Sequence, residues 1–350
     1  MKRLLLTGGC GFIGHHFVEH LLKNTDWNIV ILDRLSYASE GFDRLRDIKA
    51  FDDKRVTTLA ADFTKTIDEG LAKEIGEVNY IVHMGAETHV DNSITDAEPF
   101  VLSNVLGTMK MLEFARTLPK LEKFVQFSTD EVYGPAPGDY LYTETDRHNP
   151  TNPYAATKSG AEMLAMAYAN CYNIPVMITN TMNVFGERQH PEKYIPGTIN
   201  KILTGEKITI HANKDKTKAG TRFYIHARNV AAALLYLINK IDMTVEKYVT
   251  INGLPHYQFK YNIVGELEVD NLELAQMINK NIKEITGATK TDFKYELVDF
   301  HGARPGHDLR YGLSGQKLSD LGYEIPKAFE ESLKKTIQWF LDKKNKRWLQ

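Results

Sequence analysis

The sequence predicts an α/β protein in which a doubly wound parallel sheet is followed by a smaller α/β lobe. Short runs rich in β-branched and aliphatic residues alternate with helical patterns through the first half of the chain. Such alternation is typical of parallel strands joined by helices that cover both faces of a sheet. The 350 residues, of which 43% are hydrophobic, are enough to bury a large core and to add a lobe.

The elements of the sheet follow from local pattern. Strands are expected at Arg3–Leu6, Asn28–Leu32, Val56–Ala60, Tyr80–His83, Phe124–Phe127 and Val176–Thr179. Apolar residues at helical spacing predict helices at Phe12–Lys23, Ile67–Ile75, Glu98–Leu118 and Pro153–Tyr172.

The pattern becomes less regular after about residue 185, where prolines and glycines accumulate. We assign residues 1–185, completed by about 226–265, to a nucleotide-binding domain, and residues 186–225 and 266–350 to a substrate-binding lobe. The helix Ala227–Asn239 and the strand Tyr261–Val264 are expected to return to the main sheet. The expected elements of the lobe are Leu272–Ile285, a strand near Lys294–Val298 and the helix Phe329–Asp342.

Composition and charge exclude several classes of protein. The 43 Lys and Arg residues against 45 Asp and Glu leave a net charge of −2, without the basic patch usual in proteins that bind nucleic acid or anionic membranes. No apolar run approaches the roughly 18 residues of a membrane span. Two cysteines, Cys10 and Cys171, cannot form a disulfide framework, and no histidine pair has metal-ligand spacing. We expect a cytoplasmic protein with a small substrate and no metal.

A glycine-rich turn, Thr7–Gly14, lies between the first strand and the first helix. Gly8, Gly11 and Gly14 permit a tight turn, let the backbone approach a pyrophosphate and allow close packing of strand and helix. Asp33 ends the second strand, where an acid binds the adenosine ribose. The sequence therefore predicts a Rossmann-type sheet that binds NAD.

Two nearby residues qualify this prediction. An acid at position 33 repels the 2′-phosphate of NADP, although Arg34 could pair with that phosphate. Asp62, after the third strand, is either a partner of the adenine or a solvated acid at a strand end.

Tyr154 and Lys158 have the Tyr-x-x-x-Lys spacing, which places both side chains on one face of a helix. A nearby ammonium is expected to lower the pKa of the phenol, so that Tyr154 can accept a proton from a sugar hydroxyl. The chain holds two further copies of this spacing, beginning at Tyr236 and Tyr323. We interpret those as ordinary surface pairs, since only Tyr154 follows the fifth strand.

Two adjacent carboxyls, Asp130 and Glu131, follow the expected strand Phe124–Phe127 within the segment Ser128–Gly134. Ligands bind outside the carboxyl ends of parallel strands. An acid pair at that place can supply a general acid and a general base when its environment separates the two pKa values. The alternative is a pair that merely caps the amides of a helix start.

With these motifs in place, the sequence resembles the extended short-chain dehydrogenase/reductase family, and within it the nucleoside-diphosphate-glucose 4,6-dehydratases. The Thr-Asp-Glu triplet separates these dehydratases from the sister 4-epimerases and decarboxylases. The segments that carry the resemblance are Thr7–Gly14, His83–Asp91, Ser128–Gly134, Tyr154 with Lys158, Asn183–Gly186, Pro191–Pro196 and Arg304–Asp308.

The resemblance implies a redox cycle in three stages. Tyr154 would take the proton of the C4 hydroxyl while the C4 hydride passes to NAD⁺. Glu131 would remove the C5 proton as Asp130 protonates the departing C6 hydroxyl, and the hydride would return to C6. Thr129 would hydrogen-bond the sugar. Because an acid must stay protonated near neutral pH, Asp130 is expected to be desolvated.

The resemblance also implies binding residues, position by position. The catalytic set is Thr129, Asp130, Glu131, Tyr154 and Lys158. The NAD-binding set is Gly8, Gly11, Phe12, Ile13, Gly14, Asp33, Arg34, Ser36, Asp62, Phe63, Met84, Ala86, Ser103, Ser128, Tyr154, Lys158 and Val184. The set for the nucleotide sugar is Thr88, Thr129, Asn183, Lys193, Tyr194, Thr209, His211, Arg222, Asn271, Arg304 and His307. The helices Glu98–Leu118 and Pro153–Tyr172 would form a four-helix bundle in a homodimer.

The chain departs from the family pattern in two places. Aligned on Tyr224, it has Arg222 two positions away from the family's arginine, which leaves the pyrophosphate contact of Arg222 open. The segments Thr209–His211 and Asn213–Gly220, near where the family holds the nucleoside, also differ, which leaves the nucleobase open: thymine, uracil, guanine or cytosine. The segment Asp242–Lys260 resembles an insertion without an assigned role.

Two other functions remain open from the sequence. A 4-epimerase or decarboxylase would use the same Tyr154 and NAD but would leave the acid pair without a catalytic role. A non-catalytic NAD(H)-sensing protein on this fold is the other possibility.

Overall fold

The computed structural model describes residues 1–291, 293–299 and 309–349. Its centre is a seven-stranded parallel sheet with the order β12-β6-β5-β4-β1-β2-β3. The strands are β1 (Arg3–Thr7), β2 (Asn28–Asp33), β3 (Val56–Ala60), β4 (Tyr80–His83), β5 (Lys123–Thr129), β6 (Val176–Thr181) and β12 (Lys260–Ile263). The predicted doubly wound α/β fold is confirmed, and β12 shows that the chain returns to the sheet after residue 226.

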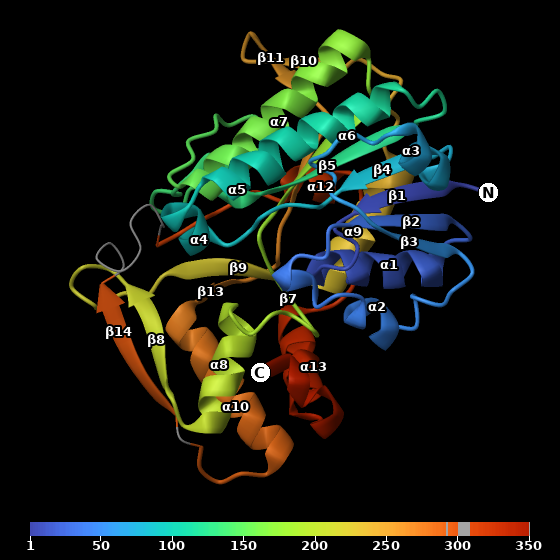
Figure 1. Cartoon of the computed structure of the whole chain (residues 1–350). Coiled ribbons are helices and arrows are strands. Elements are labelled where there is room, and N and C mark those ends of the chain that lie inside the picture. Colours follow the sequence, from blue (N-terminus) through green and yellow to red (C-terminus); the bar gives the residue numbers. More distant parts are fainter. Residues whose placement is uncertain (292, 300–308, 350) are drawn as a thin grey trace.

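Helices cover both faces of this sheet (Figure 1). On one face lie α6 (Gly107–Arg116) and α7 (Pro153–Tyr172), and on the other lie α1 (Phe12–Asn24) and α9 (Ala227–Lys240). Because the strands are buried on both sides, they are nearly continuous apolar runs: Leu4, Leu5 and Leu6 are fully buried. The shorter helices around the sheet are α2 (Asp43–Asp47), α3 (Glu69–Ile75), α4 (Val90–Thr95), α5 (Glu98–Phe100) and α12 (Gln316–Asp320).

The helix expected over Glu98–Leu118 is not a regular α-helix. Between α5 and α6 the residues Val101–Leu106 form a π-helical segment. Its wider turn accompanies the buried Asn104, whose amide exchanges hydrogen bonds with the backbone of Glu87 and donates to Thr157 Oγ1 at 2.9 Å. Tertiary contacts of one polar side chain, which periodicity does not detect, thus override the regular pattern.

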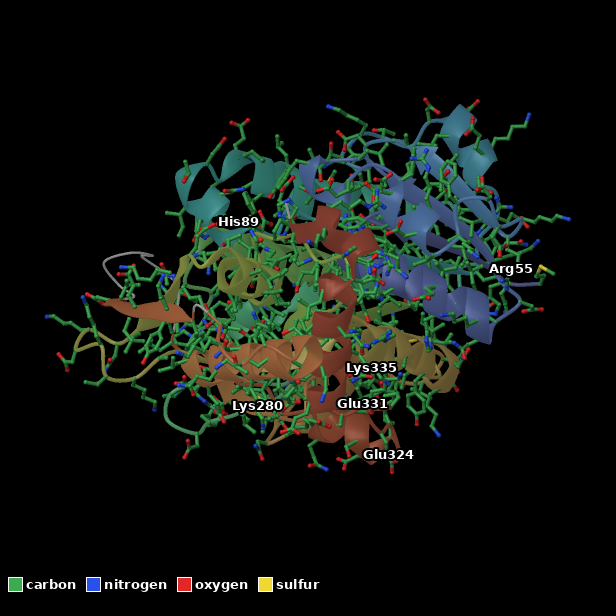
Figure 2. The ribbon with its side chains drawn as sticks, turned by 90° about the horizontal axis from the view of Figure 1, so that it is seen from below. Arg55, His89, Lys280, Glu324, Glu331 and Lys335 are labelled. Atoms are coloured by element: carbon green, nitrogen blue, oxygen red, sulfur yellow. The ribbon has the colours of Figure 1, made fainter. Side chains whose placement is uncertain are left out.

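The lobe below the sheet has its own small core. It contains β7 (Asn183–Phe185), β8 (Lys207–Ala212), β9 (Thr221–His226), β13 (Glu268–Asp270), β14 (Lys294–Asp299), α8 (Tyr194–Thr204), α10 (Asn271–Thr286) and α13 (Phe329–Leu341). Apolar residues of α13, such as Leu333 and Ile337, are fully buried in this core. On the opposite side of α13, Glu331 and Lys335 form an exposed i,i+4 ion pair (Figure 2). The division into a nucleotide-binding domain and a substrate-binding lobe stays a prediction.

The segment Asp242–Lys260 forms a β-hairpin beside the carboxyl end of α7. Its strands are β10 (Tyr248–Ile251) and β11 (Leu254–Tyr257), joined by Asn252-Gly253 with positive φ at both residues, as a type I′ turn requires. Lys247 Nζ donates to the carbonyl oxygen of Ala169 on α7 at 2.6 Å. Within the described ranges, no helix is long and apolar enough to cross a membrane.

Candidate active site

A cleft lies at the carboxyl ends of the sheet strands, between the sheet and the lobe. Its walls come from the loops after β1, β2, β4, β5 and β6 on one side and from α8, β9 and the start of α10 on the other. Parallel sheets place their ligands at this edge. Most of the predicted site residues therefore meet in one cavity, although they are spread from residue 8 to residue 271.

The glycine turn at the start of α1 fits a pyrophosphate. Gly8 has φ +74°, and a Cβ on Gly14 would lie 2.2 Å from the carbonyl oxygen of Gly8, so a side chain at position 14 would clash with the turn. Within the described chain, no side chain caps the first turn of α1. The amides of that turn are thus available to an anionic group, as the sequence predicts.

Asp33 is held at the end of β2. Its carboxylate accepts hydrogen bonds from the backbone N–H of Cys10 at 3.0 Å and of Leu35 at 2.9 Å, and burial raises its pKa. Arg34, which left NADP open, forms an ion pair with Glu87. Because its guanidinium is engaged there, this geometry favours a ribose with a free 2′-hydroxyl.

The acid pair follows β5 in a 3₁₀ turn. Asp130 is 5% exposed, and Thr129 Oγ1 donates to its Oδ1 at 2.9 Å. Asn152 Nδ2 donates to Glu131 Oε2 at 2.9 Å. Burial raises the pKa of Asp130 to about 6. Burial, together with the charge of Asp130, raises the pKa of Glu131 to about 7. The predicted desolvation of Asp130 is confirmed, and near neutral pH the pair can hold one proton, as an acid and a base together require.

The predicted lowering of the Tyr154 pKa is wrong for the protein on its own. Burial, followed by the charge of Glu131, raises the pKa of Tyr154, while a hydrogen bond with Thr129 opposes the rise. Lys158 lies on the same face of α7, but its Nζ donates to the carbonyl oxygen of Phe127 at 2.6 Å. Burial lowers the pKa of Lys158 to about 8, and the charge of Glu162 raises it. Burial of the phenol therefore sets the direction of the Tyr154 pKa.

A buried ion-pair network lies behind these residues, and the sequence did not indicate it. Glu162, one turn after Lys158, is fully buried and lies 3.0 Å from Lys260 Nζ and 3.3 Å from His148 Nε2. Burial opposes its ionisation, yet Lys260 and His148 lower the pKa of Glu162 to about 2. Asn180 Nδ2 connects this network to β5, because it donates to Glu162 Oε1 at 2.6 Å and to the carbonyl oxygen of Thr129 at 3.0 Å.

The lobe closes the other side of the cleft. Arg222 on β9 lies with its guanidinium carbon 4.7 Å from the ring centre of Tyr311, and its Nη1 donates to the carbonyl oxygen of Leu309 at 2.8 Å. Tyr224, two residues along the same strand, donates to Asn271 Oδ1 at 3.0 Å. Arg222 lines the cavity despite its displaced position in the sequence.

The cavity collects most, but not all, of the predicted binding residues. Asp62, Ser103 and Thr209 are not among its lining residues. Asp62 Oδ1 instead accepts the backbone N–H of Thr64 at 2.9 Å. Arg304 and His307 lie outside the described residues. The predicted residues that line the cavity are Gly8, Gly11, Phe12, Ile13, Gly14, Asp33, Arg34, Ser36, Phe63, Met84, Ala86, Thr88, Ser128, Thr129, Asp130, Glu131, Tyr154, Lys158, Asn183, Val184, Lys193, Tyr194, His211, Arg222 and Asn271.

Two residues of the site escaped the sequence reasoning. Asn152 caps α7 by accepting the N–H of Ala155 at 2.8 Å, and the same side chain holds Glu131. Its position before Pro153 was the available signal, since Asn followed by Pro is typical of a helix start. Arg44 also lines the cavity. Among the described residues, no group of three or more His, Cys, Asp or Glu side chains is arranged to hold a metal ion.

Comparison with known proteins gives consistent matches along the chain. The sequence profile of the family described as GDP-mannose 4,6 dehydratase matches residues 5–336. The low-salt glycan biosynthesis protein Agl12 of Haloferax volcanii is 35% identical over 338 residues, 97% of this chain and 98% of that protein. The dTDP-glucose 4,6-dehydratase of Neisseria gonorrhoeae is 34% identical over 358 residues, 99% of this chain and 97% of that protein.

Solved structures agree. DesIV, the dTDP-glucose 4,6-dehydratase of Streptomyces venezuelae with NAD and TYD bound, has a TM-score of 0.82 and 33% identity, and the match covers 100% of both chains. The UDP-glucose 4-epimerase of Thermus thermophilus in complex with NAD has a TM-score of 0.80 and 25% identity, covering 98% of this chain and 100% of that chain. The resemblance derived from the motifs is thereby confirmed. Since the profile and the relatives span almost its whole length, this chain belongs to the GDP-mannose 4,6-dehydratase family.

Proposed function

We propose that this protein is an NAD-dependent 4,6-dehydratase that converts dTDP-glucose into the corresponding 4-keto-6-deoxy sugar nucleotide. One observation carries the proposal: two adjacent carboxyls with raised pKa values, the buried Asp130 and the half-buried Glu131, lie at the end of β5 beside Tyr154. The dehydratase from Neisseria gonorrhoeae, at 34% identity, supports the reaction and the thymidine nucleotide.

The first task of the site is to oxidise C4 of the glucose unit. Tyr154 accepts the proton of the C4 hydroxyl, and Thr129, which is hydrogen-bonded to Tyr154, orients the phenol and the sugar oxygen. Bound NAD⁺ supplies the hydride acceptor and, as NADH, the hydride donor of the last step. Lys158 stays within the buried site and adds positive charge as the C4 oxygen loses its proton.

The second task is elimination of water across C5 and C6. The C4 ketone acidifies the C5 proton, which Glu131 accepts through the carboxylate oriented by Asn152. Asp130, desolvated and adjacent, donates a proton to the departing C6 hydroxyl, so that one water leaves. Because the pKa of Glu131 is the higher of the two, the reacting form is the minor one, in which the shared proton lies on Asp130 and Glu131 is ionised. A hydride then adds to C6 and Glu131 returns its proton to C5. The enzyme is restored when Tyr154 releases the proton that it took from the C4 hydroxyl and Asp130 regains one, so that the proton lost with the water is balanced. Each acid thus acts on one end of the same bond.

The same geometry separates this proposal from 4-epimerisation. An epimerase needs Tyr154 and a hydride carrier, but its reaction neither expels a hydroxyl nor removes a C5 proton. It gives no role to an acid pair at this position, and the burial of Asp130 costs free energy of folding. The presence of Asp130 and Glu131 at the end of β5 therefore supports dehydration over 4-epimerisation.

The direct test is a mass-spectrometric end-point assay of the purified protein with dTDP-, UDP-, CDP- and GDP-linked hexoses, without added NAD. The expected result is loss of one water from dTDP-glucose, which also requires that NAD is retained and recycled. Loss of water from a different nucleotide sugar would reassign the nucleobase. An unchanged mass with every substrate, also when NAD is supplied, would refute dehydration, and a changed sugar stereochemistry would then identify an epimerase.

We further propose that the protein works in the cytoplasm as a homodimer through α6, α7 and the preceding π-helical segment. Three apolar side chains support this interface, because Val101, Leu102 and Met163 are 47%, 44% and 44% exposed. The unpaired Cys10 and Cys171 are consistent with a reducing compartment. Light scattering tests the dimer, and Met163→Asp should increase the monomer fraction.

A further inference from the structure

The last described segment of the lobe reaches back to the nucleotide-binding side of the cleft. We call Lys343–Leu349, a 3₁₀ segment after α13, the tail. Arg347 of the tail forms ion pairs with Asp43 at 2.8 Å and Asp47 at 2.7 Å, both on α2. The indole Nε1 of Trp348 donates to Asp47 Oδ2 at 3.1 Å, and Trp348 is 5% exposed. The tail is therefore docked against α2.

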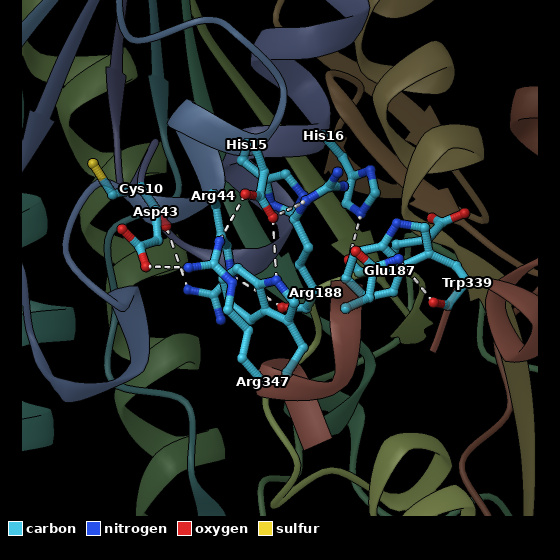
Figure 3. Close-up of polar contacts among 12 residues, drawn as sticks. Cys10, His15, His16, Asp43, Arg44, Glu187, Arg188, Trp339 and Arg347 are labelled. Atoms are coloured by element: carbon cyan, nitrogen blue, oxygen red, sulfur yellow. Dashed lines mark hydrogen bonds and ion pairs between the residues drawn. The ribbon is translucent and has the colours of Figure 1, made fainter. Parts of the chain in front are cut away.

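Arg44 lies at the centre of this contact (Figure 3). It sits on α2, is fully buried, and its guanidinium carbon lies 4.9 Å from the ring centre of Trp348. Burial lowers the pKa of Arg44 to about 10, so the side chain is still charged at neutral pH. A buried charge is stable only when it is well partnered, and the aromatic face of Trp348 supplies one of its partners.

The remaining partners of Arg44 are backbone carbonyls from separate loops. Its Nη1 donates to the carbonyl oxygen of Ala38 at 2.7 Å and approaches that of Cys10 at 3.5 Å, and its Nε donates to that of Arg188 at 3.0 Å. Cys10 belongs to the glycine turn, Ala38 follows β2, and Arg188 follows β7. Residues of all three loops line the cleft, so one guanidinium connects three loops of the cleft wall.

A second arginine, Arg188, also connects α2 with the lobe. Arg188 Nε lies 3.2 Å from Asp47 Oδ2, and its guanidinium carbon lies 5.0 Å from the ring centre of Trp339 on α13. Figure 3 shows Arg44, Arg188 and Arg347 gathered beside Asp43 and Trp339. The lobe and the nucleotide-binding domain are thus joined behind the cleft by ion pairs and cation–π contacts.

We propose that Trp348 and Arg44 are positioning residues for the adenosine half of NAD. The tail fixes Arg44, and Arg44 fixes the glycine turn and the loop after β2 in the arrangement that receives the adenosine ribose and the pyrophosphate. Trp348 acts without touching the cofactor. The inference rests on the proposed use of NAD, and it assigns NAD retention to a segment more than 300 residues from the glycine turn in sequence.

The test compares NAD affinity in variants of the full-length protein. Trp348→Leu removes the aromatic face and the indole N–H, and it should raise the Kd for NAD about tenfold, which corresponds to about 1.4 kcal/mol, a magnitude in the range of a buried cation–π contact. Trp348→Phe keeps an aromatic face and should recover part of this affinity. Lys344→Ala is the matched control, since Lys344 is 75% exposed on the same tail and its ion pair is with Asp342.

The Kd is measured by titration calorimetry on protein stripped of cofactor, and NAD carried through gel filtration is quantified separately. In dehydration assays, Trp348→Leu should need more added NAD while kcat at saturating NAD stays within about twofold of the parent. Equal NAD affinity of Trp348→Leu and the parent would overturn the proposal. If Trp348→Leu does not fold, the Kd for NAD of Arg347→Gln is compared with that of the parent instead, because this half-exposed residue can be changed without opening the core. Lack of NAD binding by the parent would instead refute the proposed function.

Discussion

Replacement of Glu162 by Gln probes the buried ion-pair network behind the catalytic strand. The side chain keeps its size, but Lys260 loses its counter-charge inside the protein. Lowering of the Glu162 pKa from 4.5 to about 2 corresponds to about 3 kcal/mol, because one pKa unit equals about 1.4 kcal/mol. Removal of one partner of a buried pair commonly costs about 3–5 kcal/mol. We therefore expect the free energy of unfolding to fall by about 3 kcal/mol at pH 7.

The pH dependence gives this prediction a sign. The folded-state pKa of Glu162 lies below its unfolded value, so its stabilisation is complete above about pH 4.5 and is lost as the pH falls toward 2. The difference between Glu162→Gln and the parent should accordingly shrink as the pH falls from 5 toward 2. Urea unfolding followed by tryptophan fluorescence at several pH values measures it.

Two further variants test the reasoning. Glu19→Gln breaks a surface pair whose lysine is 67% exposed, so it should cost less than about 0.5 kcal/mol. Glu162→Gln combined with Lys260→Met should recover most of the lost stability, because the unpaired buried charge is gone. The argument would be refuted if Glu162→Gln unfolded at the same urea concentration as Glu19→Gln.

The remaining predictions concern the reaction. Glu131→Gln should lower kcat by about 10²–10⁴ while C4 oxidation proceeds, so NADH absorbance should accumulate on the enzyme with dTDP-glucose; release of product at the parent rate would remove Glu131 as the base. Tyr154→Phe should block hydride transfer itself, and full activity or the appearance of reduced cofactor would contradict its role. With the pKa values of Asp130 and Glu131 raised to about 6 and 7, kcat/KM should peak between these values, because the base is protonated at lower pH and the acid is ionised at higher pH; a plateau from pH 5 to 9 would exclude this pair.

Local pattern in the sequence was sufficient for the central sheet. The strands at Val56–Ala60 and Tyr80–His83 and the helix Pro153–Tyr172 have the expected bounds, because buried parallel strands and amphipathic helices differ in period and length. The glycine turn, Asp33 and the acid pair were likewise visible as short motifs next to strand ends. Motifs of this kind are local, and the parallel sheet then gathers them at one edge.

Tertiary structure decided what those residues experience. The pKa of Tyr154 rises because the site is desolvated, and the π-helical segment at Val101–Leu106 accompanies the buried bonds of Asn104. Neither effect has a local signal.

The two buried charge clusters show the same limit. Lys260 meets His148 and Glu162 although 97 residues lie between Glu162 and Lys260, and Trp348 covers Arg44 although 303 residues separate them. Each of these residues read alone is an ordinary polar or aromatic side chain. Only the folded chain brings the charges close enough, and far enough from water, for their interactions to matter.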